Sequence, residues 1–133
     1  MAMNTILVIA NGLVFFTFIL HTFGGDRAYK KTEPQTDSQT QREFWTMGRG
    51  AFHLVSADFL LASIGLTLIN FTDYFTDEKL LLNILAIYFF AYGLGFLLTL
   101  IISKKFPKGF LKLGQWILLF FISGLIYWGA NQL

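Results

Sequence analysis

The sequence contains four long apolar segments separated by short charged stretches. A transmembrane helix needs roughly 20 consecutive apolar residues, so four such segments use up most of a chain of this length. Charged residues make up only 14% of the sequence, whereas about 25% is usual for soluble domains. We therefore predict an all-α integral membrane protein, an antiparallel four-transmembrane-helix bundle that forms one membrane domain over 1–133.

The charges also predict the order and orientation of the spans. In chain order we expect a first span at about 4–23, a loop at 24–47, a second span at about 48–71, a loop at 72–79, a third span at about 80–102, a loop at 103–112 and a last span at about 113–130. The first and third loops hold nearly all the Lys and Arg, whereas the second is mostly acidic. The positive-inside rule then predicts that both basic loops are cytoplasmic and both termini are on the non-cytoplasmic side. Compact loops and the lack of a eukaryotic targeting signal favour the bacterial inner membrane.

The second predicted span is the segment around which the others are expected to pack. Seven of its residues recur at spacings of three and four, which places them on one helix face, and all but Leu60 are polar; they are Arg49, His53, Ser56, Leu60, Ser63, Thr67 and Asn70. A second face carries small residues and an acid at similar spacings; these are Ala51, Val55, Asp58, Ala62 and Gly65. Small residues let a neighbouring helix approach closely. This pattern predicts that the second span is the one most surrounded by protein.

Asp58 is the residue with the sharpest functional signal. It falls near the middle of the second predicted span, and ionisable residues inside a membrane are rare and mark functional sites. A carboxyl group that gains and loses a proton there is typical of proton-coupled transport. We predict a ligand or proton site formed by Asp58 with Asn11, Tyr88 and Tyr92. The alternative is a polar lock that sets helix register, with about 0.6 kcal/mol per interhelical pair.

The two histidines of the chain form a second candidate site. His21 ends the first predicted span and His53 begins the second, so antiparallel helices would bring both to the cytoplasmic side at similar depth. Two imidazoles could share a divalent metal with a carboxylate or water, could be axial haem ligands, or could respond together to pH. Because a metal site usually has three or four ligands, the alternative is that each histidine forms its own hydrogen bond at the interface.

Other chemistry finds less support in the sequence. The absence of cysteine excludes disulfides and thiolate sites. A triad of Ser56, His53 or His21, and Asp58 lacks suitable spacing and a nucleophile turn, and no signature of a lipid-modifying enzyme is present. We therefore do not predict an enzyme. Basic residues beside the first span are interpreted as topology determinants, with anionic lipid binding as the alternative; they are Arg27, Lys30 and Lys31.

Two classes of function remain open. In the first, the bundle holds its own intramembrane polar site and binds or transports a proton, a metal ion or a small molecule. In the second, it is a non-catalytic accessory or structural subunit of a larger membrane complex. Four short helices enclose little volume, so we expect a homo-oligomer or assembly with other membrane subunits. The expected surroundings are the lipid bilayer, and nothing predicts a nucleic-acid partner.

Overall fold

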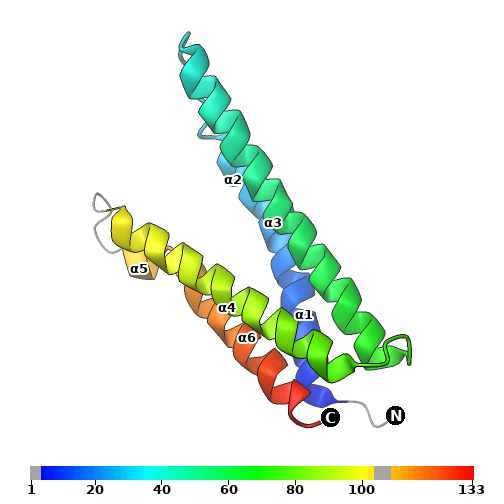
Figure 1. The fold of residues 1–133 in the computed structure, drawn as a ribbon. Helices are drawn as coiled ribbons and strands as arrows, with labels where there is room; N and C mark the ends of the chain where they lie inside the picture. Colours follow the sequence, from blue (N-terminus) through cyan, green and yellow to red (C-terminus); the bar gives the residue numbers. More distant parts are fainter. Residues whose placement is uncertain (1–3, 104–108) are drawn as a thin grey trace. The chain divides into compact units, whose positions relative to one another are not determined.

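A computed structural model describes residues 4–103 and 109–133, and all regular structure in this part of the chain is helical (Figure 1). The elements are α1 (Thr5–Ile19), the π-helix η1 (Leu20–Gly25), α2 (Asp26–Lys30), α3 (Gln39–Phe71), α4 (Glu78–Ile102), α5 (Gly109–Lys112) and α6 (Gln115–Ala130). The helix is uninterrupted from α1 through η1 to α2. The predicted all-helical class is therefore confirmed.

Three of the helices are long and apolar enough to cross a membrane. They are Thr5–Lys30, Gln39–Phe71 and Glu78–Ile102, with 26, 33 and 25 residues. The apolar helix α6 has 16 residues, which at a rise of about 1.5 Å per residue gives about 24 Å, less than the bilayer core of about 30 Å. The chain thus has the helices of a membrane protein, and three of its four predicted spans correspond to helices of spanning length.

The helices extend well into the segment that hydropathy marks as the first loop. The first helix continues to Lys30 and α3 begins at Gln39, so only 31–38 is non-helical between them. The physical reason is that Arg, Lys, Gln, Glu and Met are good helix formers, so an apolar run can end without ending the helix. The Arg42 guanidinium stabilises the turn by donating to the carbonyl oxygens of Thr36 and Asp37, at 2.7 and 3.3 Å.

The other helix ends lie closer to the predicted boundaries. Helix α4 begins where the Asp77 carboxylate accepts a hydrogen bond from the Leu80 backbone N–H at 3.0 Å, an N-cap. Residues 104–108 of the predicted basic loop lie outside the described residues, as do residues 1–3.

The described chain forms two compact units. The first comprises residues up to Ala10 together with Leu66–Leu133. Within it α4 and α6 lie side by side (Figure 1), and the Ser123 hydroxyl of α6 donates to the Ala86 carbonyl of α4 at 2.7 Å. Small residues allow close contact here, since a Cβ on Gly93 would lie 2.7 Å from the Phe120 ring. The buried apolar core of this unit is Leu7, Ala10, Leu66, Ile69, Leu82, Ala86, Phe89, Leu119, Ile122, Ile126 and Ala130.

The second unit is Asn11–Gly65, an antiparallel pair of helices. Asp26, late in the first helix, bonds to Arg49, early in α3, whereas Asn11, early in the first helix, bonds to Ser63, late in α3. The two helices therefore run in opposite directions. Its buried side chains include Val14, Phe59 and Ala62, and also the hydroxyl groups of Ser56 and Ser63. Because this helix pair buries polar groups along its length, it contains the candidate site.

Candidate functional site

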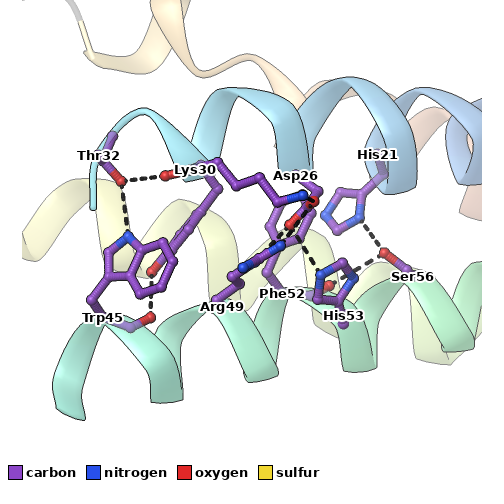
Figure 2. A network of polar contacts seen from close by, with 10 residues as sticks. His21, Asp26, Lys30, Thr32, Trp45, Arg49, Phe52, His53 and Ser56 are labelled. Atoms are coloured by element: carbon purple, nitrogen blue, oxygen red, sulfur yellow. Dashed lines mark hydrogen bonds and ion pairs between the residues drawn. The ribbon is translucent and has the colours of Figure 1, made fainter. Parts of the chain in front are cut away.

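Asp26, the first residue of α2, is the centre of a network of polar contacts (Figure 2). Its carboxylate accepts two hydrogen bonds from the Arg49 guanidinium, from Nε at 2.8 Å and from Nη2 at 3.1 Å. Lys30, one turn further along α2, places its ammonium 3.3 Å from Oδ2. His53 Nε2 lies 3.1 Å from Oδ1. Paired, charge-assisted hydrogen bonds from an arginine fork are stronger and more directional than neutral ones, so Asp26 ties α2 firmly to α3.

The π-helix η1 explains how Asp26 reaches this position. It comprises Leu20–Gly25, the segment just before Asp26. A π-turn inserts one extra residue into a helix, and such turns occur frequently at functional sites. Within η1, Gly25 lies against the Phe52 ring so closely that a Cβ there would overlap it. A glycine at this point therefore lets the two helices approach until Asp26 meets Arg49.

His21 and His53 flank the same aromatic ring. The His21 imidazole stacks on Phe52 with ring centroids 3.8 Å apart and planes 10° apart. The His53 ring meets Phe52 edge-on at 5.8 Å. Their polar partners differ, because His21 Nδ1 lies 2.9 Å from Ser56 Oγ whereas His53 bonds to Asp26. The histidines are thus neighbours of one network with separate hydrogen-bonding partners.

Aromatic and hydroxyl groups close the network on the side of the 31–38 turn. The Arg49 guanidinium carbon lies 5.5 Å from the centroid of the Trp45 ring, a cation–π contact. The Trp45 indole N–H donates to Thr32 Oγ1 at 3.4 Å, and the Tyr29 hydroxyl donates to the Trp45 carbonyl at 3.5 Å. These contacts cover one side of Arg49 and so favour its pairing with Asp26.

A further polar contact lies deeper along the same helix pair. The Ser63 hydroxyl on α3 donates to the Asn11 Oδ1 on α1 at 3.0 Å. Between this contact and the network around Asp26, the ring of Phe59 is 4% exposed and meets His21 edge-on at 5.6 Å. An apolar residue therefore separates two groups of polar contacts.

We call these contacts together the polar seam. Its residues on α3 are spaced by three to seven positions, which keeps them on one helix face. The members of the polar seam are Asn11, His21, Asp26, Arg49, His53, Ser56 and Ser63. The prediction that Arg49, His53, Ser56 and Ser63 share a face is confirmed by their partners on the first helix.

Side-chain exposure increases from Asp26 to Arg49 to His53, at the end of the polar seam nearest the 31–38 turn, which we call its outer end. The Asp26 side chain is 15% exposed, Arg49 29%, and His53 44%. His53 therefore links the solvent-accessible side to a shielded carboxylate. Asp26 follows Thr5 by 21 positions along the helix, or about 32 Å at 1.5 Å per residue. Since the bilayer core is about 30 Å thick, this end of the polar seam falls at a membrane interface when α1 crosses the bilayer.

Asp58, Tyr88 and Tyr92, which the sequence predicts to form a site with Asn11, belong to two different units. Asp58 is half-buried on α3, two positions after Ser56, and helix geometry turns it to a different side. Tyr88 and Tyr92 belong to α4 in the other unit, where the Tyr88 hydroxyl donates to the Tyr92 hydroxyl at 2.8 Å. Of this predicted ligand or proton site, Asn11 alone is a member of the polar seam.

Metal ligation was the other prediction for the histidines. Within residues 4–103 and 109–133, no three or more His, Asp or Glu side chains are grouped as a metal site requires. A divalent metal or haem at His21 and His53 stays a prediction.

Sequence reasoning missed Asp26, because the first span was expected to end before the glycine pair. One signal could have found it. Arg49 begins the second predicted span, and a cation at that place needs a counter-charge. Asp26 is the first acid after the first span, so a helix that continued through Gly24 and Gly25 would bring the two together.

The chain matches no protein-family profile, no curated protein and no solved structure. Its function is therefore inferred from the site itself.

Proposed function

We propose that this chain is a multi-pass membrane protein that binds and releases a proton at the polar seam, in the service of proton movement across the bilayer. The observation that carries the proposal is the contact between His53, which is 44% exposed, and the shielded carboxylate of Asp26. The His53 imidazole can exchange a proton near neutral pH, and the Asp26 carboxylate, which Arg49 and Lys30 keep charged, stabilises the protonated imidazole. Titratable groups of this kind inside membrane proteins form the relays of pumps and transporters.

Hydrogen-bond chemistry within the polar seam supports the proposal. A carboxylate oxygen can only accept, so His53 Nε2 carries the proton in its contact with Asp26. His21 Nδ1 and the Ser56 hydroxyl lie 2.9 Å apart, and both an imidazole nitrogen and a hydroxyl can either donate or accept. The Asn11–Ser63 contact continues the line of polar groups beyond Phe59. Displacement of the Phe59 ring would join the two groups of contacts, which makes this residue the proposed gate.

The proposal includes the membrane arrangement expected from the charges. The region 109–130 forms the fourth span, with α6 as its longest helix, and the helices form an antiparallel bundle. Both termini then lie on the non-cytoplasmic side, and the outer end of the polar seam faces the cytoplasm. The location that suits this arrangement is the bacterial inner membrane. The small size of the bundle favours a homo-oligomer as the working form.

Proton uptake by reconstituted protein tests the proposal. The full chain is placed in liposomes with an imposed pH gradient and a potassium potential, and internal pH is followed with a fluorescent dye. We expect uptake by the wild type and its loss in His53→Gln, which keeps a polar side chain but cannot exchange a proton at neutral pH. Thr99→Ala is the control, because among the described residues the Thr99 hydroxyl bonds within its own helix, to the Gly95 carbonyl at 2.9 Å. Uptake equal to that of empty liposomes would refute the proposal.

A second candidate function is that of an accessory subunit of a larger membrane complex. The observation that favours it is the extent of exposed apolar surface on the long helices. In the most apolar 18-residue stretch of each, only 17% of the residues of Thr5–Lys30, 33% of those of Gln39–Phe71 and 22% of those of Glu78–Ile102 are buried within the chain. Partner helices would cover these faces, and the polar seam would then set helix register.

Native mass measurement separates the two candidates. The protein is extracted gently from its own membrane at its natural expression level. A mass of this chain alone, as a monomer or homo-oligomer, supports the self-contained proton site. A mass dominated by other polypeptides supports the accessory role. In that case Asp58→Asn is expected to weaken assembly, whereas a self-contained proton site predicts that His53→Gln removes uptake with the fold retained.

A further inference from the structure

The short helix α2, with Lys31 directly after it, presents two charged faces with different surroundings. Asp26 and Lys30, four residues apart, face α3 and pair with each other at 3.3 Å. Arg27 and Lys31 are also four residues apart, which places them together on another face. Both of these side chains are exposed. The second face therefore carries two cations that belong to neither the Asp26 network nor the interface with α3.

The charge of Arg27 and Lys31 is not neutralised within the described part of the chain. No side chain in residues 4–103 or 109–133 forms a hydrogen bond or ion pair with either of them. Asp26, the acid next to Arg27 in sequence, is already bonded to Arg49, Lys30 and His53. By contrast, Arg42 is satisfied by two carbonyl oxygens of the 31–38 turn. Arg27 and Lys31 are thus available to an anion from outside the chain.

An exposed apolar side chain lies next to these cations on the membrane side. Phe23, one turn before Arg27, is 64% exposed. It closes an apolar helix that is long enough to cross the bilayer, so Arg27 and Lys31 follow immediately at headgroup depth. An apolar ring beside an acyl chain and two cations beside a phosphate match the two parts of a phospholipid.

We propose that Arg27 and Lys31, with Phe23 below them, form a binding site for an anionic phospholipid. The two cations contact the lipid phosphate and its acidic headgroup, and the Phe23 ring packs against the upper part of an acyl chain. A bound anionic lipid also offsets the excess of positive charge around α2, because the Asp26 carboxylate is already paired with Arg49 and Lys30. The site is separate from the polar seam and does not depend on proton movement.

Lipid titration with native mass spectrometry tests this site. The full chain in detergent is titrated with dioleoylphosphatidylglycerol, and the fraction of protein with one bound lipid is measured. Each basic residue near an anionic membrane contributes about fivefold to affinity, so Arg27→Gln with Lys31→Gln is expected to weaken binding roughly 30-fold. The matched control is Lys79→Gln with Lys112→Gln, which removes the same charge elsewhere and is expected to bind as the wild type does. Phe23→Ala is expected to weaken binding less than the double variant.

Three results would overturn the proposal. The first is unchanged phosphatidylglycerol binding in the Arg27/Lys31 double variant. The second is an equal loss in the Lys79/Lys112 control, which would show a general charge effect. The third is equal binding of dioleoylphosphatidylcholine, which has no net charge. Millimolar inorganic phosphate is included as a competitor; if it displaces the lipid completely, free phosphate rather than a lipid is the ligand and the lipid assignment is wrong.

Discussion

Replacement of Gly25 by alanine is predicted to weaken the packing of the first helix against α3. A Cβ at Gly25 would overlap the far edge of the Phe52 ring. That ring has little freedom to move away, because the His21 and Tyr29 rings both lie against it, with centroids 3.8 and 5.9 Å from its own. The added methyl group must therefore push the helices apart or displace a side chain of the polar seam.

The magnitude follows from two opposing effects. Overpacking of a close contact costs about 1–3 kcal/mol. Alanine in place of glycine within a helix returns about 0.5–1 kcal/mol. The neighbouring Gly24 provides the matched control, because no atom lies within 4 Å of a Cβ placed there. Gly24→Ala therefore gains only the helix propensity of alanine. The free energies of unfolding of the two variants are expected to differ by about 1–3 kcal/mol, with Gly25→Ala the less stable.

The assay is reversible unfolding of the full chain in mixtures of dodecylmaltoside and sodium dodecyl sulfate, followed by tryptophan fluorescence. Combining Gly25→Ala with Phe52→Leu tests the cause, since leucine lacks the ring edge that the new methyl group meets. The cost of Gly25→Ala is expected to fall in that background by a coupling energy of about 1 kcal/mol or more. Equal free energies of unfolding for Gly24→Ala and Gly25→Ala would show that the contact between Gly25 and Phe52 does not limit stability, as would a cost of Gly25→Ala that Phe52→Leu leaves unchanged.

Two further predictions concern packing and topology. Ser123→Ala removes the buried hydrogen bond to the Ala86 carbonyl between α6 and α4, and it is expected to cost about 0.6–1.7 kcal/mol in the same unfolding assay, whereas Thr99→Ala is expected to change stability little. Because the chain has no cysteine, a single introduced cysteine reports the side of the membrane on which it lies. In intact cells a membrane-impermeant thiol reagent is expected to label Leu133→Cys but not Gln35→Cys. The reverse pattern would show that the orientation is inverted.

The sequence predicted the polar face of α3 because helical spacing alone determines which residues share a side. Arg49, His53, Ser56 and Ser63 recur at intervals that fit 3.6 residues per turn, and the structure gives each a partner on the first helix. The long apolar helices were predictable for a similar reason, since their length and hydropathy can be read directly.

The partners themselves were harder to predict. Hydropathy marks where apolar residues stop, not where a helix stops, so Asp26 was placed in a loop although the helix continues to Lys30. The π-turn at Leu20–Gly25 also changes which residues face α3, and helical periodicity has no means to foresee it. Asp58 lies two positions after Ser56, so helix geometry turns it to another side of α3 than the polar seam. Its role in a ligand or proton site stays a prediction.

A measurement of proton uptake by Asp26→Asn shows whether the polar seam moves protons. Asparagine keeps the size of the side chain and an oxygen that accepts from Arg49, but it removes the carboxylate that bonds to His53. Asp73→Asn, which changes an exposed acid in the connection between α3 and α4, is the matched control. Both variants are first required to elute as the wild type does in size-exclusion chromatography. We expect liposomes with Asp26→Asn to lose proton uptake and those with Asp73→Asn to retain it. Wild-type rates of uptake in Asp26→Asn would show that the polar seam does not carry protons.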